Sequence, residues 1–194
     1  MILVSVLWNV VNYVSTPFYG SYQINELGFS MTFVSVLSAA YAIVRTVFSK
    51  PMGKFADKYS FAKMLNICFI VMLVGFIVNV FTVPENGKEL YTVYYMLNAI
   101  AMAGINSATI NLIYDYVEKE KRTGALALNS AVSGFAGFFA TLAVSPLVTY
   151  IQKNGNTFFG LNVYAQQVVS VVAAILLVGL IVYLNIVVKK IRKN

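Results

Sequence analysis

The residues of this chain that could do chemistry are a few polar side chains set in long apolar stretches. Arg45 is a charge inside such a stretch. A guanidinium in the middle of a bilayer costs about 2.5–3.5 kcal/mol, so Arg45 is expected to face other helices or a wet cavity, where it would attract an anionic group. The alternative is that its side chain snorkels to the membrane interface. On a helix, Arg45 shares a face roughly 80° wide with small and polar residues, namely Ser35, Ser38, Ala42 and Ser49.

Asparagines supply further polar positions. Asn9, Asn12 and Tyr13 lie with Thr16 within about 100° of one another on a helix, and Trp8 beside them offers a stacking surface. Asn98 and Asn106 are offset by only about 80°. Amides in such places can hydrogen-bond a polar solute, or they can bond between helices. The candidates for solute contact are therefore Trp8, Asn9, Asn12, Tyr13, Ser38, Arg45, Asn98 and Asn106.

The elements that must position these residues are membrane helices. The chain has 194 residues, of which 59% are hydrophobic and 11% are charged, whereas soluble domains average about 25% charged residues. Lipid must therefore solvate much of the surface, and a spanning helix needs about 20 apolar residues. We predict an all-α polytopic protein forming one domain over residues 1–194, with six transmembrane helices at 2–22, 31–52, 62–83, 90–116, 124–151 and 164–188.

Several kinds of chemistry are absent from the sequence. It contains no histidine, a single cysteine (Cys68) and no GxxxxGK[ST] phosphate loop, which excludes histidine-based triads, HExxH zinc sites and that mode of ATP binding. All seven acidic residues lie at or near the ends of apolar stretches. We therefore expect no enzyme, no metal site and no cofactor.

The basic residues predict the orientation in the membrane. Of the fourteen Lys and Arg residues, eleven lie at one set of helix ends, two (Lys88 and Lys153) at the other, and Arg45 is the last. Because basic ends face the cytoplasm, we expect a multi-pass protein of the plasma (cell inner) membrane with both termini cytoplasmic. No basic patch exceeds what this topology requires, so nucleic acid is not an expected partner. The eleven are Lys50, Lys54, Lys58, Lys63, Lys119, Lys121, Arg122, Lys189, Lys190, Arg192 and Lys193.

A short motif follows the second predicted helix. Pro51 and Gly53 are expected to end that helix, and Gly53 to allow close helix approach. The loop then carries Gly53, Ala56, Asp57, Lys58 and Leu65 at the spacing of the pattern G-x-L-A-D-R-x-G-R-[RK]-x-x-L, with Phe55 in place of Leu and Lys63 one step late. With six helices, this motif resembles one half of a major facilitator superfamily transporter. The eroded motif resembles the copy in the C-terminal half, and the charged segment from Asp115 to Arg122 is similar to the loop after the family's tenth helix.

The resemblance implies an architecture and a mechanism. The six helices would form two three-helix repeats, making half of a twelve-helix transporter bundle, and the first and fourth would line the central cavity. The motif loop (Gly53, Ala56, Asp57, Lys58 and Lys63) would act as a cytoplasmic latch, with Asp115 and Arg122 in the second cytoplasmic loop. A plain charged turn is the alternative reading of the motif. The chain would be cut from a longer one, and its partners would be the N-terminal six-helix half or a second copy, the lipid bilayer and a small-molecule solute.

The sequence is compatible with three functions. The first is half of a secondary transporter that moves a small polar or anionic solute by alternating access. The second is the substrate-binding membrane subunit of a vitamin-type importer, which would be energised by separate ATPase subunits. The third, a membrane-embedded lipid-modifying enzyme, is disfavoured because histidine and acidic clusters are missing. The solute and the coupling ion are not predicted, and no carboxylate lies deep in a predicted helix to carry a proton or sodium ion.

Overall fold

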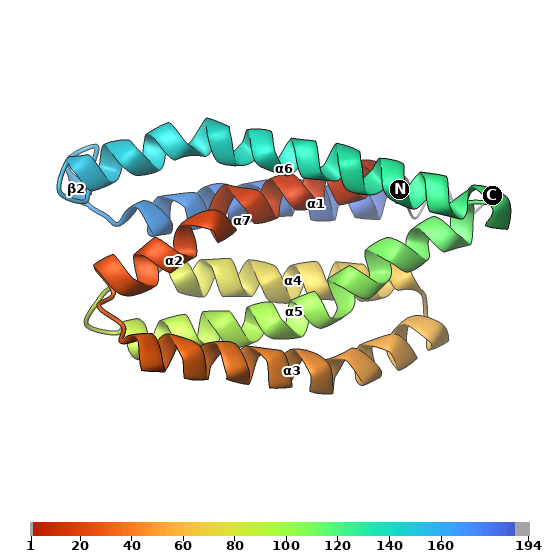
Figure 1. Ribbon diagram of the computed structural model, residues 1–194, viewed down its shortest axis with the longest axis horizontal. Coiled ribbons are helices and arrows are strands. Elements are labelled where there is room, and N and C mark those ends of the chain that lie inside the picture. The colour runs from red at the N-terminus through yellow and green to blue at the C-terminus, as the bar shows by residue number, and fades with distance from the viewer. Residues whose placement is uncertain (1, 189–194) are drawn as a thin grey trace.

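The computed structural model describes residues 2–188, without the side chains of 115, 116, 187 and 188. It confirms the all-α fold class, because helices account for nearly all of the described chain (Figure 1). Within the described residues, five helices are long and apolar enough to cross a membrane. The principal helices are α1 (Ile2–Ser15), α3 (Met31–Lys58), α4 (Phe61–Val80), α5 (Gly87–Tyr116), α6 (Arg122–Lys153) and α7 (Ala165–Tyr183).

The first predicted span is helical but broken. After α1 the chain forms a 3-10 turn, η1 (Thr16–Phe18), then one α-helical turn, α2 (Tyr19–Ser21), and then a π-helix, η2 (Tyr22–Glu26). Pro17 lies in η1, where its missing N–H removes one α-helical hydrogen bond. The first segment therefore runs to Glu26, beyond the predicted end at Tyr22, and changes helix type three times on the way.

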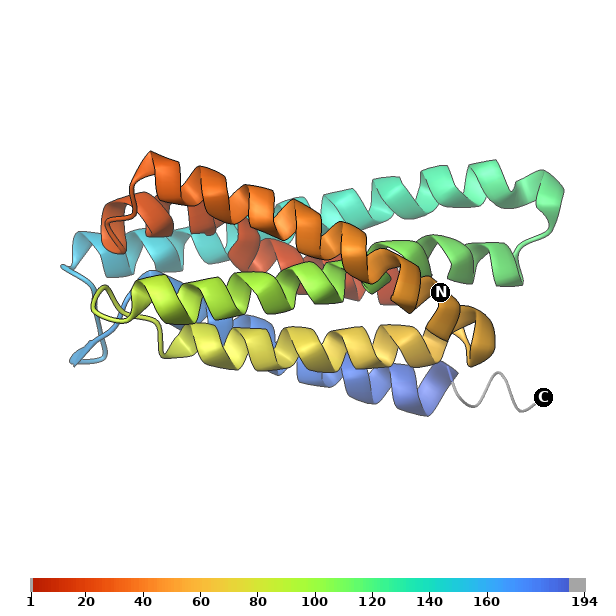
Figure 2. The ribbon, with the colours of Figure 1, turned by 90° about the horizontal axis from the view of Figure 1, so that it is seen from below.

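The helices pack in two matching sets. α1 packs against α6 and α7, α5 packs against α3 and α4, and α4 also packs against α7. In chain order the first set is α1, α3 and α4, and the second set is α5, α6 and α7. The first helix of each set thus contacts the second helix of the other set. Figures 1 and 2 together show α1 and α5 between α3 and α6, with α4 and α7 forming the opposite layer.

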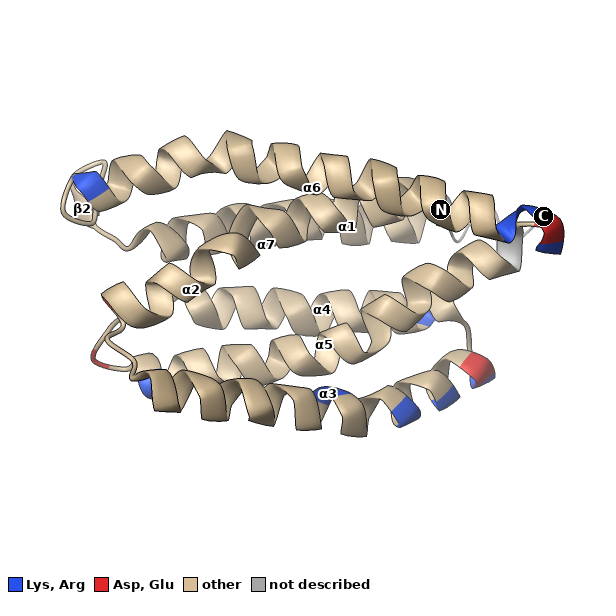
Figure 3. Ribbon diagram, in the orientation of Figure 1, with Lys and Arg blue, Asp and Glu red and all other residues tan. Residues whose placement is uncertain are grey.

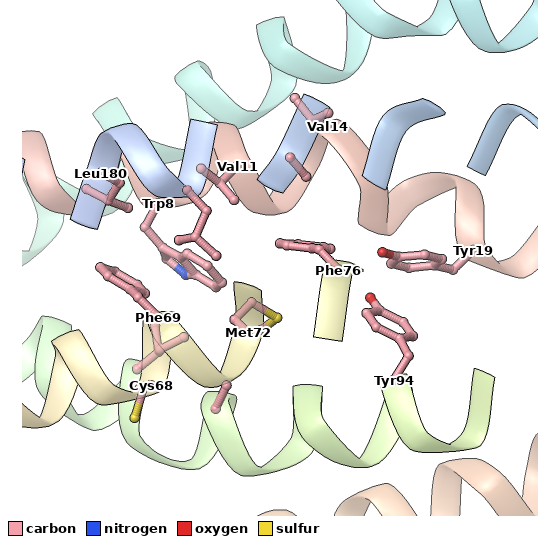
Figure 4. Packing of buried hydrophobic residues seen from close by; sticks show 14 of the residues in the cluster. Trp8, Val11, Val14, Tyr19, Cys68, Phe69, Met72, Phe76, Tyr94 and Leu180 are labelled. Atoms are coloured by element: carbon pink, nitrogen blue, oxygen red, sulfur yellow. The ribbon is translucent and has the colours of Figure 1, made fainter. Parts of the chain in front are cut away.

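Aromatic and sulfur-containing side chains fill the core between these layers. The Trp8 and Phe69 rings are stacked with their centroids 5.4 Å apart, and Met72 and Phe76 continue the cluster along α4 (Figure 4). α4 and α5 approach closely where Gly104 faces Cys68, because a Cβ at Gly104 would overlap the cysteine sulfur. Cys68 is fully buried there and is a packing residue.

The second helix does not end where the sequence predicts. α3 continues through Pro51 and Gly53 to Lys58, six residues beyond the predicted end at Met52. The expectation that Pro51 and Gly53 stop the helix is therefore wrong. The chain reverses only at Tyr59 and Ser60, where the Ser60 hydroxyl accepts a hydrogen bond from the Lys63 N–H at 3.2 Å and caps α4.

The remaining boundaries differ from the predicted ones by a few residues. α4 ends at Val80 and not at 83, α5 begins at Gly87 and not at 90, and α6 extends over Arg122–Lys153 without interruption at Pro146. The segment between α6 and α7 forms a small antiparallel hairpin that the sequence did not predict. Its strands are β1 (Thr157–Phe158) and β2 (Leu161–Asn162). A second π-helical turn, η4 (Leu184–Val188), follows α7.

The charged residues gather at the two ends of the bundle, as Figure 3 shows. Most of the lysines and arginines lie at the end where α3 stops and α6 begins, whereas Lys88 and Lys153 lie at the opposite end. The 3-10 turn η3 (Lys119–Lys121) at the basic end carries an ion pair between Lys121 Nζ and Glu118 Oε2 at 2.7 Å. Lys189, Lys190, Arg192 and Lys193 lie outside the described residues.

Candidate functional site

Two helices leave one side of the bundle open. Only 6% of the most apolar stretch of α3 is buried, and 17% of that of α6, compared with 39% for α4 and 44% for α5. α3 and α6 flank α1 and α5 (Figure 2), so these four helices form the open side. We call it the open face, meaning the side formed by α3, α5, α1 and α6.

Arg45 is half-buried on α3, which packs against α5. One helical turn before it, the Tyr41 hydroxyl donates a hydrogen bond to Asn98 Oδ1 at 3.1 Å, and Arg45 is close enough to act on that tyrosine electrostatically. The Asn98 amide in turn donates to the Tyr94 hydroxyl at 3.3 Å. Among the acidic residues whose side chains the structure describes, which do not include Asp115, none lies within ion-pair distance of Arg45. The structure thus brings two predicted residues, Arg45 and Asn98, together through Tyr41.

The residues predicted on the first helix form a separate group at the contact between α1 and α6. Asn9 donates to the Ser5 carbonyl at 3.0 Å, and Asn12 Oδ1 accepts from the Thr16 hydroxyl at 2.9 Å, so these amides bond within their own helix. Tyr13 is 40% exposed. Its carbonyl accepts a hydrogen bond from the Thr141 hydroxyl of α6 at 3.0 Å, and its ring packs over Gly137.

The structure corrects the placement of Trp8. Its side chain is only 5% exposed and points toward Phe69 and Leu180 in the core (Figure 4), whereas the sequence predicted Trp8 as a stacking surface for a solute. Indole carries a large apolar surface, and packing against α4 and α7 removes that surface from its surroundings. Asn106 is half-buried on α5, and Ser38 is exposed on α3.

The motif residues Gly53, Ala56, Asp57, Lys58 and Lys63 form the last turns of α3 and the start of α4. Ala56 is buried, and Asp57, Lys58 and Lys63 are exposed. The ammonium groups of Lys58 and Lys63 lie 5.2 and 5.7 Å from the centroid of the Tyr59 ring. No atom comes within 4 Å of a Cβ built at Gly53, so the expectation that this glycine permits close helix approach is wrong within this chain.

Arg122 closes the end of α5. Its Nη2 donates to the Tyr114 carbonyl at 2.8 Å and its Nε to the Val117 carbonyl at 3.1 Å, while the guanidinium lies over the Tyr114 ring. These bonds satisfy carbonyl groups that the last helical turn leaves without partners. Sequence reasoning found Arg122 but not this role. The side chain of Asp115, its predicted companion, lies outside the described residues.

The chemistry available to this arrangement is binding. Among the described residues, no group of three or more histidine, cysteine or acidic side chains is placed to hold a metal ion. The open face offers one cation with a phenol and an amide beside it, and hydroxyl and amide groups on the opposite edge. Such groups can recognise an anionic or polar molecule through charge-assisted and neutral hydrogen bonds.

Membrane-crossing helices in two matching three-helix sets, with polar groups on one open side, define a multi-pass membrane protein. The family model described as Major Facilitator Superfamily matches residues 1–193. The chain therefore belongs to the Major Facilitator Superfamily, a family of transporters. Neither the curated proteins nor the solved structures gave a match to this chain.

Proposed function

We propose that this chain is one half of a secondary transporter that moves a small anionic or polar solute by alternating access. The proposal rests on the surroundings of Arg45. A cation without a carboxylate partner among the described residues, half-buried beside Tyr41 and Asn98, is costly in a membrane unless an anion or water meets it. In this proposal Arg45 attracts the anionic group, and Tyr41 and Asn98 orient it.

The open face supports the need for a second half. α3 is scarcely buried along its apolar stretch, yet it carries the exposed Ser38 and the half-buried Arg45. Uncovered polar groups are unfavourable in lipid. An N-terminal six-helix half, or a second copy of this chain, would cover them and enclose a solute path between the two halves. This transporter would lie in the plasma membrane with both termini in the cytoplasm, as the distribution of basic residues favours.

The family membership favours a transporter over the other two functions considered. A vitamin-importer subunit has no support from the match, and a transporter family gives no reason to expect catalysis. Asp57, at the end of α3 and exposed, is proposed to contact the other half in one state of the cycle and to act there as a latch.

Arg45→Ala tests the proposal. A thermal-shift screen of small carboxylates, phosphate esters and neutral polyols would first identify a solute that stabilises the purified protein. A charge-assisted hydrogen bond contributes about 1.5–3 kcal/mol, so the variant should bind an anionic ligand about 10- to 150-fold more weakly. Uptake of the same anion into proteoliposomes by the complete transporter should fall in parallel.

The control for this experiment is Lys153→Ala, which removes a cation at the end of α6 away from Arg45. Its binding and uptake should match those of the unmodified protein. Arg45→Lys, which keeps the charge without the planar fork, should fall between Arg45→Ala and the unmodified chain. Unchanged affinity for the anion in Arg45→Ala would overturn the proposed role.

A further inference from the structure

The contact between α1 and α6 holds both the main chain and the ring of Tyr13. The Thr141 hydroxyl of α6 donates a hydrogen bond to the Tyr13 carbonyl at 3.0 Å. One turn earlier on α6, Gly137 is buried, and a Cβ built there would lie 2.9 Å from Cγ and Cδ2 of the Tyr13 ring. The ring therefore rests directly on the backbone of α6, and two successive turns of that helix fix one residue of α1.

The carbonyl that Thr141 meets is one that the first segment cannot satisfy by itself. In an α-helix the carbonyl of residue 13 accepts a hydrogen bond from the N–H of residue 17. That residue is Pro17, which has no N–H. Threonine hydroxyls are among the groups that satisfy such freed carbonyls in membrane helices. The Thr141 hydroxyl thus supplies from α6 the donor that Pro17 lacks.

The Thr141 hydroxyl has a second acceptor within reach. The Gly137 carbonyl of its own helix lies at 3.2 Å, and a hydroxyl has only one hydrogen to donate. Thr109 of α5 provides a comparison, because the bonds of its hydroxyl among the described residues go to the carbonyls of Ile105 and Asn106 in the same helix. What distinguishes Thr141 from Thr109 is the acceptor on another helix.

The two parts of the first segment are held by different helices. Beyond the break, the Tyr22 hydroxyl donates to the Thr82 carbonyl at 2.9 Å, and Gln23 Nε2 donates to the Tyr91 hydroxyl of α5 at 2.7 Å. Before the break, α1 packs mainly against α6 and α7. Tyr13 lies in the last turn of α1, where the α-helical bonding of the segment stops, so its position depends on α6.

We propose that Thr141 and Gly137 are positioning residues for Tyr13. Thr141 replaces the N–H that Pro17 lacks and so fixes the main chain, and Gly137 leaves room for the ring. The Tyr13 side chain is 40% exposed at this contact. In the transporter proposed above, on which this part of the inference rests, the two residues of α6 hold the Tyr13 ring and hydroxyl for contact with the solute.

Hydrogen–deuterium exchange of the full chain in detergent tests the Thr141 bond. Thr141→Val keeps the shape of the side chain and removes its hydroxyl. A typical hydrogen bond changes an equilibrium constant by a factor of roughly 2 to 13, so the amides of residues 16–22 should exchange faster by that factor as the break opens more often. Thr141→Ser restores the hydroxyl and should exchange as slowly as the unmodified protein. Thr109→Val, the matched control, should also leave residues 16–22 unchanged.

Two outcomes of this experiment would overturn the proposal. The first is equal exchange of residues 16–22 in Thr141→Val and in the unmodified protein, which would mean that the hydroxyl bonds only to Gly137. The second is an equal acceleration in Thr109→Val, which would mean that the loss of any threonine hydroxyl has the same effect.

A pair of glycine variants tests the position of the ring and decides the matter if Thr141→Val does not fold. Gly137→Ala places a methyl group against the Tyr13 ring, whereas a Cβ at Gly134, one turn earlier on α6, meets no atom within 4 Å. Tetranitromethane nitrates accessible tyrosines, and Tyr150, which is 58% exposed, serves as the internal standard. Gly137→Ala should raise the nitration of Tyr13 relative to Tyr150, and Gly134→Ala should not. Equal nitration of Tyr13 in the two variants would overturn the proposal.

The contact with the solute has a separate readout. In proteoliposomes containing the complete transporter, Thr141→Val should raise KM for the anion selected by the thermal-shift screen and change kcat little. A lower kcat with an unchanged KM would refute the contact. Exchange and nitration require no solute, so their failure would leave the role of Arg45 intact, and failure of the Arg45→Ala test would leave the positioning of Tyr13 intact.

Discussion

The close approach of α4 to α5 gives a prediction that can be worked from the structure. Gly104 on α5 has no room for a side chain, because a Cβ there would overlap the sulfur of Cys68 and lie 3.5 and 3.6 Å from Met64 Cγ and Sδ. Cys68 and Met64 are fully buried on α4, so neither can move outward into lipid. Gly104→Ala should therefore push the two helices apart or force Cys68 into a strained rotamer.

The expected cost follows from core overpacking. Inserting one methyl group into a well-packed core typically costs about 1–3 kcal/mol. A change of this size lowers the melting temperature by roughly 2–12 °C if a helical membrane domain of this length responds as a soluble one does. The intrinsic helix propensity acts in the other direction, because alanine is favoured over glycine by about 1 kcal/mol in a helix, which leaves a net loss of about 0–2 kcal/mol, or at most roughly 8 °C. A measured loss of stability would thus be due to packing and not to propensity.

A double variant separates the contact from other causes. Cys68→Ala removes the sulfur and leaves a small cavity, which costs about 1 kcal/mol. In Gly104→Ala with Cys68→Ala the new methyl group occupies that space, so the double variant should be more stable than the sum of the single changes predicts. Thermal unfolding in detergent, followed by intrinsic fluorescence of Trp8, would measure the three variants.

Gly179→Ala is the matched control, since Gly179 also lies in a membrane helix, α7, but has no atom within 4 Å of an added Cβ. It should leave the melting temperature unchanged or raise it slightly. The reasoning is refuted if Gly104→Ala is as stable as Gly179→Ala, or if the effects of Gly104→Ala and Cys68→Ala simply add.

Three further predictions concern the ends of the bundle and the open face. Asp57→Asn should alter the rate of transport by the complete transporter without changing the order of solute preference; identical kinetics over a range of solute concentrations would leave only a charged turn. At the end of the bundle that carries Lys153, Glu26 accepts a hydrogen bond from Gln152 at 2.8 Å, and burial raises the pKa of its carboxyl above the ordinary 4.5. A carboxyl whose pKa is higher in the folded than in the unfolded state holds its proton more tightly in the folded protein. Below pH 4.5 it is protonated in both states and does not reduce stability, and as the pH rises through the folded-state pKa the folded protein must bury a charge and loses stability. Glu26→Gln should therefore raise the melting temperature near neutral pH and make no difference in acid, and an equal effect at both would contradict this. Finally, single cysteines at Asn12 or Ser38 should crosslink two copies of the isolated chain through the open face, and solute uptake by a strictly monomeric chain would refute the proposed half-transporter.

Much of the fold is readable from apolar runs and turn residues. The six predicted segments correspond to the helical segments of the structure, because a run of about 20 apolar residues has one stable form in lipid. The end of α3 was missed because proline and glycine normally stop helices. Here Pro51 is exposed near the basic end of the bundle, where water can satisfy the freed carbonyl. Beyond it, Ala56 is buried and Phe55 packs on Tyr59 with ring centroids 4.7 Å apart, which favours continuation of the helix.

The candidate site was less predictable because its contacts join distant parts of the chain. Tyr41 lies one turn from Arg45 but pairs with Asn98, and nothing local to either residue indicates that α3 and α5 meet at that height. Trp8 lies only about 40° from Asn12 around the helix. So small an angle places both residues on one face and does not show that one of them points into the core. Which edge of the helix faces the core depends on α4 and α7, whose positions the sequence does not specify.

The matching contacts of the two helix sets have a consequence for biogenesis. α1 makes its main contacts with α6 and α7, and α6 begins only at Arg122. During synthesis the first segment must enter the bilayer long before its partners exist. In this interval Asn9 and Asn12 have no partners on other helices, but their side chains are hydrogen-bonded to Ser5 and Thr16 within the same helix. These local bonds lower the cost of exposing the two amides to lipid before α6 and α7 are present. The order of insertion therefore favours polar residues that can bond within the first helix.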